Sequence, residues 1–298
     1  MNITADQWSD YELLDAGDGM KLERWGNIIL SRPDPQAIWK PVKPELWKQA
    51  HAVYIRSSAG GGSWKKMKEY PSKWTVSYKD LRFYIEPTGF KHTGLFPEQA
   101  ANWEWMRKLI LHAADNKKTV RILNLFGYTG GAAVACAAAG AAVCHVDASK
   151  GMVTRARENV QLSGLSGREV RYIVEDAFKF VAREIRRGSR YDGFIMDPPS
   201  YGRGPNGEVW RLEDQLYDFA AECGKLLSDR PLFFLLNSYT TGFSSEVTGN
   251  ILKLLIAEKY CGEVVHGDVC LPITAMRDGF LPCGSYAAWR IGEKRTKE

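Results

Sequence analysis

The sequence predicts an α/β protein, in which a doubly wound and mostly parallel sheet follows a smaller β-rich domain. Two observations predict this architecture. Between residues 121 and 236, short apolar runs alternate with amphipathic stretches of about 10–15 residues, the pattern of strands joined by crossover helices. The early part of the chain instead has short runs around turn signals, and eight of the ten tryptophans lie within the first 105 residues. We therefore expect domains at 1–89 and 90–298.

The early elements are expected to be two hairpins. Runs at 11–15 and 20–25 flank an Asp18-Gly19 step, which is a strong signal for a tight hairpin turn. Runs at 74–78 and 81–85 repeat the pattern. The segments between the hairpins are a strand at 27–30, a proline-rich connection at 33–44 and a glycine-rich loop tip at 60–63.

From residue 99 the pattern becomes that of alternating helices and strands. Apolar residues recur three and four apart over 99–114, which predicts the first helix. The expected strands lie at 121–126, 143–146, 170–174, 193–196 and 232–236. The expected helices between them lie at 132–139, 150–162, 177–187 and 212–227.

Composition excludes several classes of protein. With 298 residues, 45% hydrophobic and 25% charged, the chain can bury a core and is neither disordered nor a coiled coil. Its six cysteines form no CxxC pair, so we expect no disulfide scaffold and no metal site, and scattered thiols suggest a reducing compartment. The start has no signal sequence, and the stretch 130–144 is too short to span a membrane. We expect a cytoplasmic protein, and its net charge of +5 is compatible with a polyanionic partner.

Ligands of such sheets bind beyond the carboxyl ends of the strands, so the residues that follow each strand form the candidate site. The first parallel strand runs into a small turn, 124–131, where the backbone can approach a ligand closely. Its spacing is not that of dinucleotide-binding proteins, since Phe126 and Tyr128 stand where glycines would be needed. A plain connection from strand to helix is the alternative interpretation.

Three acidic residues follow the next strands. Asp147 can accept hydrogen bonds from two ribose hydroxyls, or can favour the next helix through its dipole. Asp176 can accept a hydrogen bond from an exocyclic amine such as that of adenine, or can cap the following helix. Asp197 precedes Pro198 and Pro199, which fix the backbone and remove two donors. This third loop is the most specific signal in the chain.

Together these segments resemble class I S-adenosylmethionine-dependent methyltransferases. The segments that carry the resemblance are 123–131, 146–149, 175–177 and 197–199, with 93–96 and Gln99 ahead of them. The form Asn-Leu-Phe-x-Tyr-Thr-Gly-Gly is narrower than the superfamily and resembles bacterial methyltransferases that modify bases of large-subunit ribosomal RNA. The resemblance runs from about residue 90 to about residue 290. It implies a seven-stranded Rossmann-like sheet, S-adenosylmethionine as cofactor and RNA as substrate.

The resemblance also assigns roles to residues. The methionine end of the cofactor would be held by Asn124, Phe126, Gly127, Tyr128, Thr129 and Gly130. The ribose would be bound by Asp147, with Ala148 and Ser149 beside it, and the adenine would face Asp176 and Ala177. The segment that would close over the cofactor comprises Thr93, Gly94, Leu95, Phe96 and Gln99. The residues between the methyl group and its acceptor would be Asp197, Pro198 and Pro199.

Departures from the family pattern bear on the chemistry. Methylation of cytosine carbon 5 needs a cysteine thiolate, expected after the fifth strand, where this chain has Asn237 and no thiol. We therefore favour direct transfer to a nitrogen of an RNA base, and only Cys270 or Cys283 would reopen the covalent alternative. Tyr201 stands one position later than the aromatic of amine methyltransferases and can stack a base. The candidate substrate-binding residues are Tyr201, Arg203 and Asn237.

Other interpretations stay open at this point. The acceptor can be a protein or a small molecule, or the chain can be a binding module that keeps the fold without catalysis. Lysines at 65, 66 and 68 and an arginine cluster at 183–190 are candidate contacts with RNA, or simply solvated faces. The β-rich domain is thus a candidate for docking RNA. His145 lies inside a strand and is expected to be structural, and the sequence indicates no oligomeric state.

Overall fold

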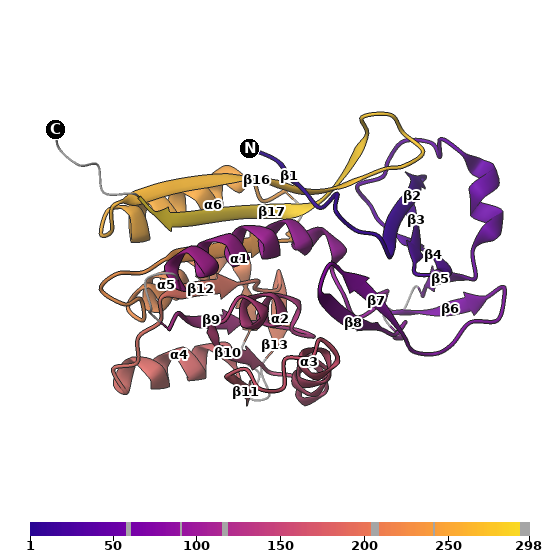
Figure 1. Cartoon of the computed structure of the whole chain (residues 1–298). Helices are drawn as coiled ribbons and strands as arrows, with labels where there is room; N and C mark the ends of the chain where they lie inside the picture. The colour runs from indigo at the N-terminus through magenta and orange to yellow at the C-terminus, as the bar shows by residue number, and fades with distance from the viewer. Residues whose placement is uncertain (58–60, 90, 115–118, 204–208, 241, 293–298) are drawn as a thin grey trace. The chain divides into compact units, whose positions relative to one another are not determined.

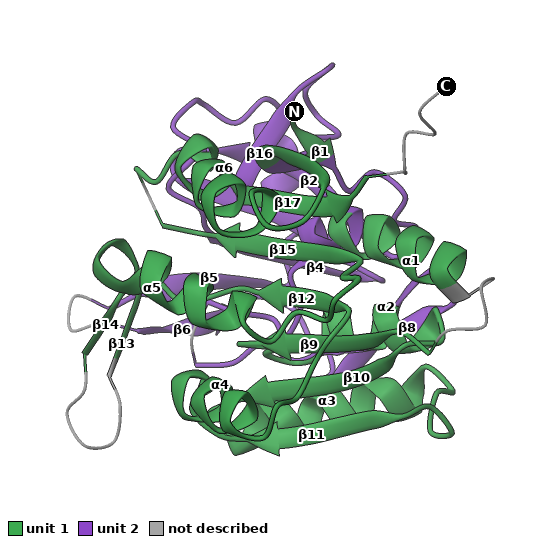
Figure 2. Cartoon of the chain, turned by 90° about the vertical axis from the view of Figure 1, so that its left-hand side faces the viewer, with its two compact units in different colours: residues 1–3, 102–268, 284–298 green, residues 4–101, 269–283 purple. Residues whose placement is uncertain are grey.

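The computed structural model describes residues 1–57, 61–89, 91–114, 119–203, 209–240 and 242–292. The side chains of residues 114 and 203 also lie outside the description, as do residue 90 and the loop after residue 203. The chain forms two compact units, coloured separately in Figure 2. Unit 1 comprises 1–3, 102–268 and 284–298, and unit 2 comprises 4–101 and 269–283. Late residues thus belong to the same unit as the early part of the chain.

Unit 1 is built on an eight-stranded sheet, whose strands are stacked in Figure 2. The strand order is β1 (Ile3–Thr4), β16 (Gly262–Pro272), β17 (Phe280–Ile291), β15 (Phe233–Ser238), β12 (Gly193–Met196), β9 (Arg121–Leu125), β10 (Ala142–Asp147) and β11 (Val170–Val174). The strands from β15 to β11 are parallel, and β17 is antiparallel to β15. The doubly wound α/β fold is confirmed, with one strand more than the seven expected because the start of the chain adds β1 next to β16.

Helices cover both faces of this sheet (Figure 1). The helices are α1 (Ala100–Ala114), α2 (Gly131–Ala138), α3 (Lys150–Leu162), α4 (Ala177–Arg186), α5 (Leu212–Gly224) and α6 (Ser245–Leu252), which continues into a π-helical turn, η3 (Lys253–Ala257). One buried core joins α4, α5 and α6 to the side chains of alternate strand residues such as Leu125, Val146 and Met196. The intervening strand residues, such as Asn124 and His145, face the opposite side because side chains alternate along a strand.

Unit 2 is β-rich, as expected for the early part of the chain. Its five-stranded sheet has the order β2 (Tyr11–Gly17), β3 (Met20–Trp25), β4 (Ile28–Pro33), β5 (Ala52–Arg56) and β6 (Gly62–Lys66). A separate hairpin is formed by β7 (Trp74–Tyr78) and β8 (Leu81–Ile85), and two 3-10 turns are η1 (Pro44–Gln49) and η2 (Pro97–Gln99). The late segment joins this unit through backbone pairing of Leu13 with Ile273 and of Ala5 with Cys270.

Both expected hairpins and the five expected parallel strands are confirmed, each within about two residues of its predicted ends. Helix α5 ends three residues before its expected end because the chain turns away after Gly224. There the carbonyl of Leu226 accepts a hydrogen bond from the amide of Tyr191 at 2.8 Å. The short hairpin of β13 (Tyr201–Arg203) and β14 (Val209–Arg211) was not expected, and it follows directly on the proline loop.

Candidate cofactor and acceptor site

Strand register brings the ends of four parallel strands to one edge of unit 1. Leu125 of β9 lies opposite Val146 of β10 and Met196 of β12, and Met196 in turn lies opposite Leu236 of β15. Each of these residues is followed by a segment that the sequence marked as part of the site. Since parallel strands share one carboxyl edge, Asp147, Asp197, Asn237 and the turn after β9 lie at the same edge.

The β9–α2 turn, residues 126–130, is held in place by its backbone. Phe126 and Tyr128 adopt left-handed conformations, with φ of 55° and 51°, although neither is glycine. Such conformations are uncommon for bulky residues and persist only where the surroundings enforce them. The amide of Gly127 donates to the carbonyl of Val146 at 3.0 Å, and that of Gly130 donates to the carbonyl of Gly127 at 3.0 Å. The sequence pattern did not reveal that non-glycine residues make this turn.

Gly127 is required for another reason, which is the histidine beside it. A Cβ atom at Gly127 would lie 2.3 Å from Cε1 of His145 and 2.9 Å from Nδ2 of Asn124. His145 is fully buried within β10, and its Nδ1 lies 3.4 Å from Nδ2 of Asn124. Burial lowers the pKa of the His145 imidazole to about 4, so a neutral ring supports the turn. His145 lies inside a strand, as expected, and Asn124 contacts the turn from the same side.

Asp147 ends β10 and accepts two backbone hydrogen bonds. Its Oδ2 accepts from the amide of Tyr128 at 2.8 Å, and its Oδ1 accepts from the amide of Ser149 at 2.8 Å. Burial raises the pKa of the Asp147 carboxyl even though both amides favour its charged form. A partly desolvated carboxylate with two lone-pair positions still to fill is suited to hydroxyl donors.

Asp176 follows β11 and caps α4, because its Oδ1 accepts from the amide of Lys179 at 3.1 Å. The capping interpretation therefore holds, and within the described residues its second oxygen has no partner. The neighbouring Glu175 pairs with Nη1 of Arg183 at 2.6 Å, which neutralises one member of the arginine cluster. Ser149 caps α3 through the amide of Met152 at 3.5 Å.

The loop after β12, residues 197–200, is held from two sides. Nε1 of Trp210 donates to the carbonyl of Pro199 at 2.6 Å, while the indole ring packs against Phe178 of α4. On the other side, Oγ1 of Thr240 donates to Oγ of Ser200 at 2.7 Å. We call this segment the β12 loop. Pro198 is buried, whereas Pro199 and Ser200 are exposed, so the loop presents a fixed outer edge.

Two of the three candidate substrate residues are placed on this side of unit 1. Tyr201, directly after the β12 loop, is 49% exposed. Asn237 near the end of β15 is buried, and its Oδ1 accepts from Nδ2 of Asn102 of α1 at 3.1 Å. Arg203 ends β13, and its side chain lies outside the described residues. Sequence reasoning missed Trp210, Thr240 and Asn102, because none of them lies within a recognisable motif.

The segment expected to close over the cofactor belongs to unit 2. Gly94 has a φ of 92°, which only glycine adopts readily, and the carbonyl of Thr93 accepts from the amide of Glu86 at 2.9 Å. The hydroxyl of Thr93 is buried, and the described residues offer it no hydrogen-bond partner. Leu95 and Gln99 are also buried. Closure over a cofactor stays a prediction.

The six cysteines are all free, and four of them are poorly suited to nucleophilic chemistry. Burial raises the pKa of Cys136 to about 12 and that of Cys144 to about 11, and it raises the pKa values of Cys223 and Cys283 well above the usual range. A nucleophilic cysteine needs the opposite shift. The exposed Cys261 accepts a backbone hydrogen bond from Gly292, just beyond the end of β17 that pairs with the start of β15. It therefore lies at the edge of the sheet opposite the candidate site.

The described residues contain no group of three or more histidine, cysteine, aspartate or glutamate side chains that could hold a metal ion. Among the same residues, no helix is long and apolar enough to cross a membrane.

Comparisons with known proteins decide the family. The profile of an S-adenosylmethionine-dependent methyltransferase family matches residues 53–219. The chain belongs to this methyltransferase family. A solved relative, the SAM-dependent methyltransferase from Agrobacterium tumefaciens, superposes with a TM-score of 0.90 at 36% identity, covering 97% of this chain and 93% of that one. The resemblance inferred from the motifs, the fold class and the cofactor are thereby confirmed.

Curated relatives of this methyltransferase are named for ribosomal RNA. Ribosomal RNA large subunit methyltransferase K/L of Shewanella oneidensis is 30% identical over 224 residues, which cover 72% of this chain and 28% of that protein. Ribosomal RNA large subunit methyltransferase K of Neisseria meningitidis serogroup B is 25% identical over 253 residues, covering 82% of this chain and 68% of that one. The chain thus spans less than a third of the length of the K/L relatives that it matches.

Proposed function

We propose that this methyltransferase transfers a methyl group to a nitrogen atom of a base in ribosomal RNA. The observation that carries the nitrogen assignment is the β12 loop, which is fixed at the carboxyl edge of the sheet and itself contains no cysteine. The names of the curated relatives support ribosomal RNA as the substrate class. Such a reaction takes place in the cytoplasm, which the free thiols also favour.

The residues at the strand edge fit S-adenosylmethionine. Asp147 combines a desolvated carboxylate with geometry that leaves acceptor positions for the two ribose hydroxyls. The β9–α2 turn would hold the methionine end through the backbone of 126–130, with Asn124 and His145 keeping the turn in shape. Asp176 uses one oxygen as a helix cap and would direct the other, with Ala177 beside it, toward the adenine amine.

The acceptor would be aligned by the β12 loop. When bound, S-adenosylmethionine would supply a methyl group on a positively charged sulfur. The lone pair of a base nitrogen would bond to this methyl carbon as the carbon–sulfur bond breaks, with S-adenosylhomocysteine as the leaving group. Asp197 would accept a proton or a hydrogen bond from the attacking nitrogen, and Pro198 and Pro199 would keep the backbone rigid. Tyr201 would stack the base, for which its exposed ring is suited, with Arg203 and Asn237 alongside.

Covalent methylation of cytosine carbon 5 is the main alternative. It needs a thiolate that adds to the ring before methyl transfer. Cys270 is buried, and burial raises the pKa of the Cys283 thiol well above its usual range. These observations disfavour the alternative and support direct transfer. The early β-rich part, 1–89, would contribute to RNA binding through exposed lysines such as Lys65.

The test is transfer of a labelled methyl group from S-adenosylmethionine to purified bacterial ribosomal RNA, to large subunits, and to total protein. We expect label in RNA or in the subunit RNA, and we expect Asp197→Ala to abolish transfer while cofactor affinity stays within about twofold. Label confined to protein would refute the RNA assignment. Undiminished transfer by Asp197→Ala would refute the role given to the β12 loop.

A further inference from the structure

One face of the five-stranded sheet of unit 2 gathers cations. In the register of β3 and β4, Lys21 lies opposite Arg32 and Glu23 opposite Leu30. Leu30 in turn lies opposite Ala52 of β5. Because side chains alternate along a strand, the polar residues of β3, β4 and β5 that share this face with Leu30 and Ala52 include Lys21, Glu23, Arg32, Tyr54 and Arg56. We call it the cation face.

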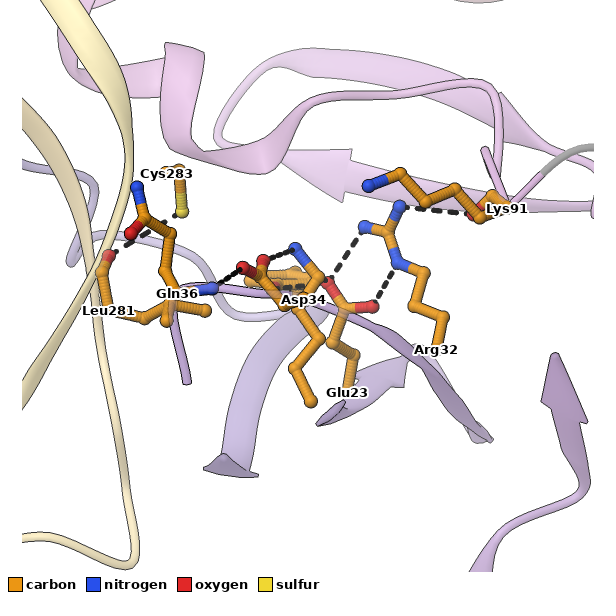
Figure 3. Close-up of polar contacts among 9 residues, drawn as sticks. Glu23, Arg32, Asp34, Gln36, Lys91, Leu281 and Cys283 are labelled. Atoms are coloured by element: carbon orange, nitrogen blue, oxygen red, sulfur yellow. Dashed lines mark hydrogen bonds and ion pairs between the residues drawn. The ribbon is translucent and has the colours of Figure 1, made fainter. Parts of the chain in front are cut away.

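Residues 88, 89 and 91, which follow β8, accept hydrogen bonds at their backbone carbonyls from side chains on this side of the sheet. Nε1 of Trp64 donates to the carbonyl of Thr88 at 2.8 Å, and the hydroxyl of Tyr54 donates to the carbonyl of Gly89 at 3.2 Å. Nη1 of Arg32 donates to the carbonyl of Lys91 at 3.3 Å. In Figure 3 the Lys91 side chain extends over the guanidinium of Arg32. This segment therefore adds another cation to those already on this face.

Two of the cations are neutralised by carboxylate partners. Arg32 forms a two-pronged pair with Glu23, in which Nη2 lies 2.9 Å from Oε1 and Nε contacts Oε2. Lys21 lies 3.1 Å from Oδ2 of Asp34. Burial alone would raise the pKa of Glu23, but the charges of Arg32 and Lys21 hold it at about 2. This part of the cluster is a fixed structural network (Figure 3).

Lys91 and Arg56 differ from that pair, because neither has a carboxylate partner among the described residues. Burial lowers the pKa of the Lys91 amine, and the charges of Lys21, Arg32 and Arg56 lower it further, against the opposite pull of Asp34. The neighbouring His92 is held neutral, since burial, Arg32, Lys91 and Lys21 lower its pKa to about 4. Among the described residues, the charged groups that act on the Lys91 amine are three cations and one carboxylate, that of Asp34. The surroundings of Lys91 are therefore predominantly positive.

We propose that Lys91 and Arg56 bind one phosphate group on the cation face. A phosphate supplies negative charge and accepts hydrogen bonds from both side chains. The positive charges of Arg32 and Lys21 add to the electrostatic attraction. Building on the proposed function, the phosphate belongs to the backbone of the RNA substrate. The site lies just before the 93–96 segment in the chain, so that RNA bound here would engage the unit that carries this segment.

The site is tested first without RNA. The full-length protein is labelled with ¹³C at lysine Cε, the Lys91 signal is assigned with Lys91→Arg, and each lysine is titrated with and without inorganic phosphate. We expect phosphate to raise the pKa of Lys91, because a bound anion stabilises the ammonium form. Lys40 is the matched control, since it is exposed and already pairs with Asp18 at 2.8 Å, and its pKa should not move. A Lys91 pKa that phosphate does not change would overturn the proposal. If S-adenosylmethionine then raises that pKa, Lys91 instead contacts the carboxylate of the cofactor.

RNA binding provides the second arm. Lys91→Met and Arg56→Ala should each weaken binding of a ribosomal RNA fragment about tenfold. Each should also lower the slope of log affinity against log salt by about 0.7–0.9, the value for one phosphate contact. Lys40→Ala should change neither quantity. Unchanged slopes in both variants, with RNA still bound and methylated, would overturn this site and leave the proposed function intact. Wild-type protein that binds no RNA would instead refute the function, and the phosphate titration would still decide the site.

Discussion

Replacing Asp147 tests how this protein holds its cofactor. Each carboxylate oxygen accepts one backbone amide at 2.8 Å and keeps a second lone pair, so the pair can accept both ribose hydroxyls. Removing hydrogen bonds to a charged group costs about 1.5–3 kcal/mol. Asp147→Ala should therefore raise the dissociation constant of S-adenosylhomocysteine by about 10- to 150-fold in a calorimetric titration.

The alanine variant also releases the amides of Tyr128 and Ser149, so turn shape and ribose contact must be separated. A thermodynamic cycle that compares S-adenosylhomocysteine with its 2′,3′-dideoxy form separates these two effects. Wild-type protein should lose about 10- to 150-fold in affinity for the dideoxy ligand. For Asp147→Ala, the affinities for the two ligands should differ by less than about twofold, because this variant has already lost the ribose contact. Asp229→Ala, an exposed carboxylate before β15, is the control and should behave as wild type. Equal losses in wild type and Asp147→Ala would refute the ribose contact.

Other predictions follow from the same contacts. Gly127→Ala places a Cβ 2.3 Å from His145 and should lower the free energy of unfolding in urea by about 1–3 kcal/mol. If Gly127→Ala lowers that free energy equally in wild type and in His145→Ala, the clash with His145 is refuted. Because burial lowers the pKa of His145 from 6.5 to about 4, protonation favours the unfolded chain. The unfolding free energy should therefore fall by up to ~3 kcal/mol from pH 6.5 to 4, less so in His145→Gln, and a pH-independent stability would refute this. Trp210→Phe should lower single-turnover methyl transfer about 3- to 10-fold while calorimetric cofactor affinity holds, and an unchanged rate would remove Trp210 from positioning the β12 loop. Cys270→Ala with Cys283→Ala should keep transfer within about twofold, and an inactive but folded double variant would restore the covalent mechanism.

The parallel strands could be predicted from the sequence because each is a short apolar run bounded by turn residues. The same local signal placed Asp147, Asp176 and Asp197 after their strands. Asp176 shows the limit of that reasoning, since a cap and a ligand contact use the same residue type at the same position. Only the structure shows that one oxygen serves the helix.

Features that depend on distant pairing could not be predicted. The contact of Gly127 with His145 exists because β9 and β10 lie side by side, and nothing in either segment alone signals it. The return of 269–283 to the early unit depends on pairing with residues such as Leu13, more than 250 positions away in the chain. Likewise, the cation face brings together side chains from separate strands whose register is set by tertiary structure.

The central claim is direct methyl transfer to a base nitrogen of ribosomal RNA, and nucleoside mass spectrometry tests it most directly. Ribosomal RNA is treated with the protein and methyl-labelled S-adenosylmethionine, digested to nucleosides, and fragmented to locate the label. The proposed mechanism predicts one labelled nucleoside with the methyl group on a nitrogen. A label on carbon 5 of cytosine, or label in no RNA nucleoside while the cofactor still binds, would contradict it.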